Sequence, residues 1–141
     1  MVLCEQQKDV IASVLPVSVG LISGALEPNQ WRDNALWRRV ITDHRVVVST
    51  PQVLLDAMRN GHISLGEDIG LLVFDEAHHV ADKHPYNMIM QEQYFRLPLD
   101  LHPAILGLTA SPSFGKLYLS IVYVTQLTFS TVGANVSLAF E

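Results

Sequence analysis

The stretch of sequence that decides the fold runs from residue 69 to residue 78 and reads IGLLVFDEAH. Its first six residues carry no polar side chain and predict a strand buried on both faces, as in parallel sheets. Asp75 and Glu76 follow directly. Ligands of open α/β sheets bind beyond the carboxyl ends of the strands, and a charge buried without a partner or a metal is costly. The two acids therefore indicate a functional site, although acids in this place also suit the start of a helix.

Strands and helices alternate along the chain around this stretch. Runs of apolar residues predict strands at 17–22, 45–49, 69–74 and 104–108. Helical spacing of apolar residues predicts helices at 5–15, 30–42, 52–59 and 86–95. Asn29 is the expected cap of the second helix, Pro51 stands where the third can begin, and Asn60-Gly61 is its expected C-cap. This alternation predicts an α/β fold, a parallel sheet with helices on both faces.

Composition places limits on the function. The 141 residues suffice for one domain, and 49% of them are hydrophobic, so the chain can form a core. The formal net charge of −5 makes it a poor nucleic-acid binder by itself, because affinity for phosphates comes mainly from Lys and Arg. A basic cluster of Arg32, Arg38, Arg39 and Arg45 fits a solvated helix face or, alternatively, an RNA-facing patch. Cys4 is the single cysteine, and we expect an intracellular location, cytoplasmic or nuclear.

The composition changes abruptly after Gly115. Residues 117–140 carry no charge, and a stretch of this length could cross a membrane. Hydroxyl and amide side chains are spread throughout it, so we expect no membrane span. The codons of Gly115-Lys116-Leu117 can contain a splice donor, which makes the tail a candidate translated intron. We therefore divide the chain into a partial domain at 1–114 and a tail at 115–141 that is disordered or loosely attached, without a partner in the sheet.

Several segments resemble, in order, the motifs of one enzyme family. Leu71–His79 resembles motif II of DEAH-type helicases, and Leu106–Pro112 resembles motif III of Dicer and related helicases. Val46–Leu54 resembles the Ser/Thr-Pro-Gln motif, and Leu3–Gln7 resembles the end of motif Ia. Two further segments similar to Dicer-type helicases are Trp31–Trp37 and His84–Met90. The chain thus resembles the N-terminal RecA-like domain of a superfamily 2 RNA helicase, most of all the helicase region of fungal Dicer-like proteins.

The resemblance implies a partial RecA-like parallel sheet with flanking helices, without the first (phosphate-loop) strand and helix. It also implies ATP and Mg²⁺ as cofactors. Asp75 would coordinate Mg²⁺, Glu76 would activate the attacking water, and His78 would link the nucleotide site to motif III. The motif III residues, which would couple nucleotide state to the grip on RNA, are Thr109, Ala110 and Ser111.

The resemblance also implies an RNA-contacting face. Thr50, Pro51 and Gln52 would lie along the RNA backbone, where a helix N-terminus and polar groups can bind phosphate. Gly24 would allow close approach of that backbone, with an ordinary turn glycine as the alternative. The implied partners are double-stranded RNA and the remaining helicase and RNase III domains of a parent protein that acts in RNA silencing.

Three functions stay open at this point. The first is an enzyme part, in which the DEAH motif hydrolyses ATP in an RNA helicase. The second is a non-catalytic fragment that at most binds RNA or a helicase partner weakly, because no G-x-x-x-x-G-K-[ST] phosphate loop occurs in the 141 residues. The isolated chain is therefore expected to be inactive. The third, a metallohydrolase built on Asp75, Glu76 and nearby histidines, does not explain the segments at 50–52 and 109–112 and is set aside.

Overall fold

The centre of the molecule is a β-sheet that contains the decisive stretch. Within the residues that the computed structural model describes (2–22, 32–75, 77, 83–108 and 121–125), the sheet has five strands. They lie in the order β1 (Val19–Ile22), β2 (Val46–Ser49), β5 (Ile121–Thr125), β3 (Ile69–Phe74) and β4 (Ala104–Gly107). β1 pairs in parallel with β2, and β3 in parallel with β4. The four strands predicted from apolar runs are therefore confirmed.

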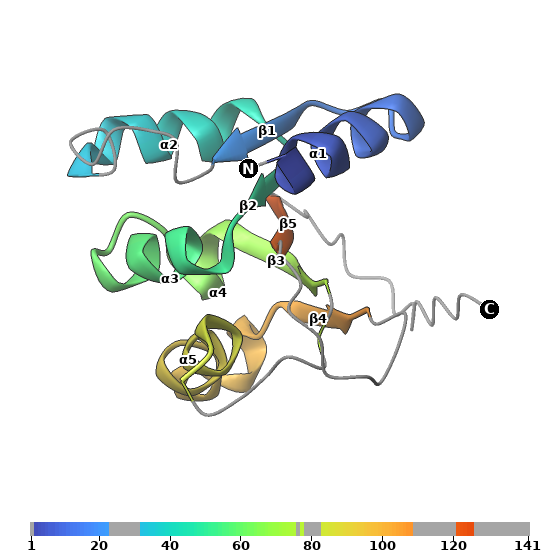
Figure 1. Ribbon diagram of the computed structural model, residues 1–141. Coiled ribbons are helices and arrows are strands. Elements are labelled where there is room, and N and C mark those ends of the chain that lie inside the picture. The colour runs from blue at the N-terminus through green and yellow to red at the C-terminus, as the bar shows by residue number, and fades with distance from the viewer. Residues whose placement is uncertain (1, 23–31, 76, 78–82, 109–120, 126–141) are drawn as a thin grey trace.

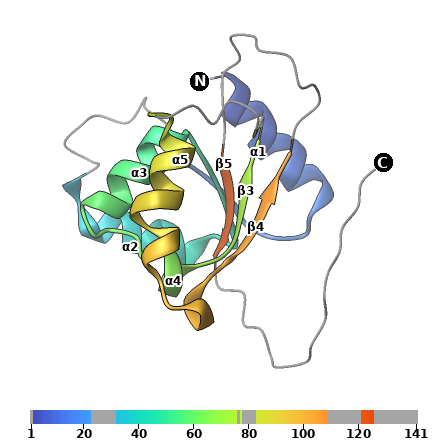
Figure 2. The ribbon, with the colours of Figure 1, turned by 90° about the horizontal axis from the view of Figure 1, so that it is seen from below.

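Helices cover both faces of the sheet (Figure 1, Figure 2). α1 (Val2–Val14) lies on one face and contacts β1 and β2. The other face is covered by α2 (Asn34–Asp43), α3 (Pro51–Arg59) and α5 (Pro85–Glu92). The chain also forms short helices that the apolar spacing did not predict. They are the α-helix α4 (Leu65–Asp68) and the 3-10 helices η3 (Tyr94–Arg96) and η4 (Leu99–Leu101).

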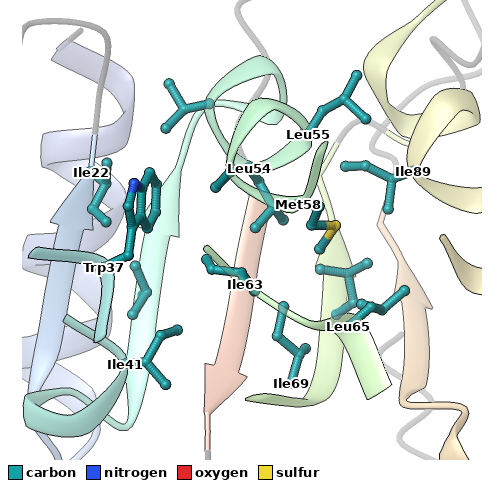
Figure 3. Packing of buried hydrophobic residues seen from close by; sticks show 14 of the residues in the cluster. Ile22, Trp37, Ile41, Leu54, Leu55, Met58, Ile63, Leu65, Ile69 and Ile89 are labelled. Atoms are coloured by element: carbon teal, nitrogen blue, oxygen red, sulfur yellow. The ribbon is translucent and has the colours of Figure 1, made fainter. Parts of the chain in front are cut away.

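The valine run of β2 shows why both faces need cover. Val47 belongs to the large core beneath α2, α3 and α5, together with Trp37 and Leu54 (Figure 3). Val46 and Val48 point the other way, into a smaller cluster beneath α1 that includes Cys4. Successive side chains of a strand alternate between faces, so an unbroken apolar run needs a core on each side. Burial also raises the pKa of the Cys4 thiol and keeps it protonated.

The helix ends show which local signals were decisive. α2 begins at Asn34, four residues later than predicted from 30, so the predicted start was wrong. Its cap is Asp33, whose carboxylate accepts a hydrogen bond from the Ala35 amide at 2.8 Å, while Asn29 lies outside the described residues. Asn and Asp cap helices about equally well, which is why the sequence did not separate the two. The Asn60 C-cap of α3 is confirmed, and Gly61 has a φ of 72°, which suits glycine.

Strand β5 corrects the expectation of an all-parallel sheet. It comes from the uncharged tail and pairs antiparallel with both β2 and β3, which makes the sheet mixed. Residues 121–125 therefore do have partners in the sheet, contrary to the expectation for the tail. The division at residue 114 stays a prediction. Because β5 runs opposite to both neighbours, β2 and β3 run in the same direction, and the carboxyl ends of β1, β2, β3 and β4 share one edge.

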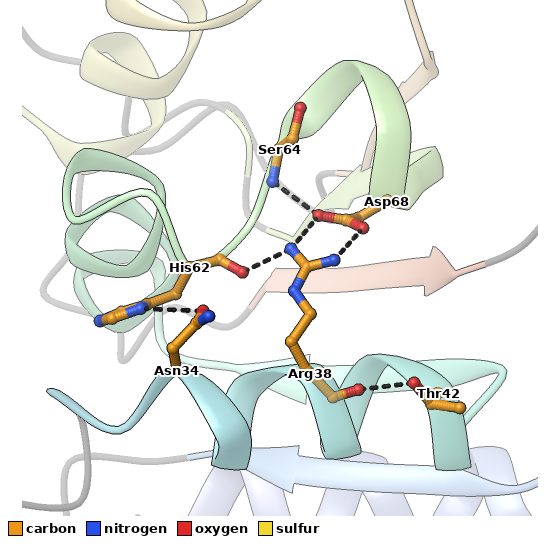
Figure 4. Close-up of polar contacts among 6 residues, drawn as sticks. All are labelled: Asn34, Arg38, Thr42, His62, Ser64 and Asp68. Carbon is orange, nitrogen blue, oxygen red and sulfur yellow. Dashed lines mark hydrogen bonds and ion pairs between the residues drawn. The ribbon is translucent and has the colours of Figure 1, made fainter.

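An arginine of the basic cluster ties α2 to α4 (Figure 4). The Arg38 guanidinium donates to both carboxylate oxygens of Asp68, at 2.9 and 2.8 Å, and to the His62 carbonyl at 2.7 Å. The hydrogen bond that Arg38 donates to Asp68 raises the pKa of Arg38. Arg38 therefore has a structural role in the free protein. Because its side chain is 47% exposed, the pair contributes little stability and mainly sets the position of α2.

A second ion pair joins α3 to α5. Arg59 donates to the two carboxylate oxygens of Glu92, at 2.8 and 2.6 Å. These hydrogen bonds lower the pKa of Glu92. The ion pair therefore stabilises the folded protein at pH values above the ordinary glutamate pKa. This stabilisation is lost as the pH falls through the lowered pKa of Glu92. The pair orients α5, the helix that carries Tyr86.

Removal of one buried hydroxyl group is expected to stabilise the protein. Ser49 is fully buried at the end of β2, and among the described residues its Oγ has no hydrogen-bond partner. An unsatisfied buried donor costs about 1–3 kcal/mol, so Ser49→Ala should raise the free energy of unfolding by about 1 kcal/mol, measured by urea denaturation. The matched control is Ser18→Ala, because the Ser18 hydroxyl accepts a bond from the Arg45 amide at 3.1 Å. A loss of stability in Ser49→Ala would mean that this hydroxyl is in fact bonded.

Candidate functional site

The shared carboxyl edge of the strands collects the residues singled out in the sequence. β2 ends at Ser49 and is followed by Thr50, and β3 ends at Phe74 and is followed by Asp75. β4 ends at Gly107, directly before the segment expected to couple nucleotide state to RNA binding. Because β2, β3 and β4 run in the same direction, the three segments that follow them lie at one side of the sheet, where α/β proteins bind ligands.

Asp75 is held from two sides by residues distant in sequence. Gln7 of α1 donates from Nε2 to the Asp75 carboxylate oxygen Oδ2 at 2.5 Å. Tyr86 of α5 donates from its hydroxyl to the Asp75 carbonyl oxygen at 2.7 Å. The first bond acts on the side chain and the second on the backbone, so α1 and α5, on opposite faces of the sheet, together define the position of this acid.

The turn after β3 is also bonded to the end of β4. The Leu108 amide donates to the Phe74 carbonyl at 2.8 Å, and the Ala77 amide donates to the Leu108 carbonyl at 2.8 Å. Gly107 lies so close that a Cβ at this position would be 3.1 Å from the Ala77 Cβ. Any displacement of residues 107–108 would therefore be transmitted to the turn that carries Asp75.

A mostly apolar groove of about 560 Å³ leads to Asp75. Its walls are formed by α1 residues such as Val10 and by Leu71 and Val73 of β3. Its polar groups include Gln7 and Asp75. A low-dielectric groove with a carboxylate at its end strengthens the electrostatic interactions made there.

The helix that follows β2 presents a second polar feature. Thr50 is the N-cap of α3, in an extended conformation, and its side chain makes no capping hydrogen bond. Pro51 is buried at the first helical position. Gln52 is exposed, and its amide donates to Asp56 at 2.8 Å. The N-terminal amides of α3 and the Thr50 hydroxyl can therefore meet an anion, whereas Gln52 would have to exchange its bond to Asp56.

Several predicted site residues lie outside the described residues. These are Gly24, Glu76, His78, Thr109, Ala110 and Ser111. Their roles stay predictions. Asp75, Ala77 and Leu108 are described, and they place the starts of the segments that resemble motifs II and III at the same edge of the sheet.

The chemistry of Asp75 fits Mg²⁺. The carboxylate is half-buried at the end of the groove and offers the oxygen ligands that Mg²⁺ prefers. Among the described residues, no three His, Cys, Asp or Glu side chains form a metal-binding group. One carboxylate is nevertheless a usual protein contribution to Mg²⁺, which keeps waters and phosphate oxygens as its other ligands.

Sequence reasoning missed Gln7 and Tyr86 as parts of this site. Gln7 belongs to the segment that resembles the end of motif Ia, and Tyr86 belongs to the Dicer-type segment 84–90. The resemblance of these two segments implies no role for either residue. In each case the available signal was a polar group on an otherwise apolar helix face. For Tyr86 the signal is clear, because a buried Tyr hydroxyl usually has a hydrogen-bond partner.

In the described part of the chain, no helix has both the length and the apolar character needed to cross a membrane. The uncharged residues 126–140 are not among those described.

Comparisons with known proteins agree with the motif pattern. The DEAD/DEAH box helicase family matches residues 1–118. The chain is 46% identical over 115 residues to Dicer-like protein 2 of Aspergillus terreus, covering 78% of this chain and 8% of that protein. It is 41% identical over 107 residues to Endoribonuclease Dicer homolog 1 of Arabidopsis thaliana, covering 76% of this chain and 6% of that one.

A solved structure supports the fold. The Hef helicase domain of Pyrococcus furiosus superposes with a TM-score of 0.61 at 29% identity, covering 82% of this chain and 23% of that chain. The chain thus spans less than a tenth of the Dicer-like relatives and about a quarter of the helicase structure. Both the predicted fold class and the predicted resemblance are confirmed. With a family match that extends over residues 1–118, the chain belongs to the DEAD/DEAH box helicase family.

Proposed function

We propose that this chain is part of the ATP-dependent RNA motor of a Dicer-like protein that acts on double-stranded RNA in RNA silencing. The observation that carries the proposal is the turn after β3, where Asp75 is bonded to α1 and α5 while its neighbours are bonded to the end of β4. Such a turn joins a metal-binding acid to the segment that follows β4. The identity to Dicer-like protein 2 supports the choice of parent.

The chain's own residues would divide the work at the sheet edge. Asp75 would hold Mg²⁺, which would neutralise negative charge on the phosphates of ATP. Glu76 would orient the attacking water, and His78 would contact motif III. The hydrogen bonds of Leu108 with Phe74 and Ala77 would carry a change at the nucleotide to residues 109–111.

RNA would be bound at the neighbouring strand end. The α3 N-terminus carries the partial positive charge of the helix dipole, and Thr50 adds a hydroxyl group that is not used for capping. Pro51, Gln52 and Gly24 would line the same path. Because the chain has a net charge of −5, most of the affinity for RNA would come from the other helicase and RNase III domains of the parent.

A second function is supported by one sequence observation. The 141 residues contain no phosphate-loop sequence, so the chain by itself would be a non-catalytic fragment that binds RNA or a helicase partner weakly. We further propose an intracellular location, cytoplasmic or nuclear, in keeping with a single cysteine that cannot form an internal disulfide.

The test is a hybrid enzyme. Residues 1–114 would replace the matching segment of Dicer-like protein 2 of Aspergillus terreus, and RNA-stimulated ATP hydrolysis would be measured. We expect the hybrid to hydrolyse ATP, Asp75→Asn to lose that activity, and the isolated 141-residue chain to show none. Asp100→Asn is the matched control, because Asp100 is an exposed acid that precedes β4, at the opposite edge of the sheet.

Two results would contradict the proposal. A folded hybrid in which Asp75→Asn hydrolyses ATP as fast as the unsubstituted hybrid would remove Asp75 from the site. RNA-stimulated hydrolysis by the isolated chain, abolished by Glu76→Gln, would show that the chain needs no phosphate loop from elsewhere.

A further inference from the structure

Gln7 stands at an unusual place on α1. Cys4 and Ile11, three residues before it and four after it, lie on the same helix face and pack against β1 and β2. An apolar side chain is therefore expected at position 7. Gln7 is half-buried instead, and it reaches a carboxylate 68 residues away in sequence.

The bond between Gln7 and Asp75 has the features of a strong hydrogen bond. Its acceptor is a carboxylate oxygen, and hydrogen bonds to ionised acceptors are about twice as strong as neutral ones. The surrounding groove is mostly apolar, so water competes little for either partner. Holding a long amide side chain in one rotamer costs conformational entropy, which a bond of this kind offsets.

The backbone of the turn does not need Gln7. The Asp75 carbonyl is bonded to the Tyr86 hydroxyl, and the flanking Phe74 carbonyl is bonded to the Leu108 amide. In the described part of the turn, the Gln7 side chain donates to the carboxylate and not to the backbone. Its hydrogen bond therefore determines the orientation of the carboxylate plane rather than the path of the chain.

We propose that Gln7 is a positioning residue for the metal-binding carboxylate, so that helix α1 controls how Asp75 presents its oxygens to Mg²⁺. The inference rests on the proposed function of Asp75 as a metal ligand. A hydrogen bond to Oδ2 fixes the rotamer in which the carboxylate meets the ion. Any movement of α1 along the sheet would then alter metal binding directly.

The test uses Mn²⁺ as the probe and the 141-residue chain as the protein. Mn²⁺ broadens nuclear magnetic resonance signals near its site, so the dependence of the Phe74 and Ala77 amide signals on its concentration yields an apparent Kd. Partners of metal-bound carboxylates typically contribute 10-fold to 100-fold in metal affinity. Gln7→Met, which keeps the length of the side chain and suits a helix, should therefore weaken Mn²⁺ binding about 10-fold.

Matched variants separate the possible outcomes. Gln6→Met is the control, because Gln6 lies in the same groove but is exposed, and it should leave the Kd unchanged. If Asp75→Asn abolishes the broadening while Gln7→Met leaves the Kd within twofold, Gln7 has no positioning role and the metal site itself stands. If the broadening is absent in the unsubstituted chain, or survives Asp75→Asn, the proposed metal site is wrong.

The bond itself has an independent readout without metal. The Gln7 side-chain amide protons should exchange slowly with solvent in the unsubstituted chain and fast in Asp75→Ala. Gln7→Asn keeps an amide but shortens the side chain by one methylene group, so it should weaken Mn²⁺ binding as Gln7→Met does. Fast exchange of the Gln7 amide in the unsubstituted chain would overturn the inference even if every variant folds.

Discussion

Trp37→Ala is expected to lower the free energy of unfolding by about 3–5 kcal/mol. Trp37 is 2% exposed and fills the space between β1, β2 and α3, where it packs with residues such as Ile22 and Leu54 (Figure 3). Its ring also stacks on His62, with ring centroids 6.3 Å apart. Removing it would leave a cavity that the surrounding strands and helices cannot close.

Urea denaturation followed by circular dichroism would measure this loss. Domains of this size are usually stable by only about 5–15 kcal/mol, so Trp37→Ala should remove a large fraction of the total stability and shift the urea midpoint to a lower concentration. Leu99→Ala serves as the control, because Leu99 is 86% exposed and its truncation should change stability by less than about 0.5 kcal/mol. A loss below about 1 kcal/mol in Trp37→Ala would contradict the packing described for α2.

The second large effect concerns Tyr86, and two substitutions separate its ring from its hydroxyl. Tyr86 is fully buried. Its ring lies 4.5 Å from that of Phe74 and 4.7 Å from that of His84, between centroids. Tyr86→Ala should cost about 3–5 kcal/mol through loss of the ring. Tyr86→Phe should cost about 1 kcal/mol, because it keeps the ring and loses the hydrogen bond from the hydroxyl to the Asp75 carbonyl.

Amide hydrogen exchange would show where the hydroxyl acts. In Tyr86→Phe, the amides of Ala77 and Leu108 should exchange faster than in the unsubstituted chain, because the turn after β3 loses an anchor. Tyr94→Phe is the control, since Tyr94 is half-buried and packs against His102 near the opposite edge of the sheet. Unchanged exchange in Tyr86→Phe would mean that the turn is held by β4 alone.

The elements of the fold were largely predictable because their signals are local. An apolar run of six residues was enough to predict β3, and Pro51 marked the start of α3. The predicted start of α2 was wrong because Asn29 and Asp33, which cap helices about equally well, stand four positions apart. Strand β5 was missed because its pairing with β2 and β3 depends on contacts far along the chain, which no local pattern encodes.

The position of Asp75 followed from sequence, but its partners did not. A residue directly after a buried parallel strand must lie at the carboxyl edge of the sheet. Gln7 and Tyr86, in contrast, reach Asp75 from two helices on opposite faces. Which helical residues meet that edge depends on how each helix docks, and docking is determined by side-chain packing across the whole sheet.

By itself, then, the sequence determined that strands and helices alternate, that residues 69–74 form a strand, and that Asp75 lies at its carboxyl end. These features depend on periodicity and turn residues within short windows. Only the tertiary structure decided the place of β5 in the sheet and the bonds that hold Asp75, because each joins residues from separate elements. A hydrogen bond between Gln7 and Asp75 exists only once α1 has packed on β1 and β2.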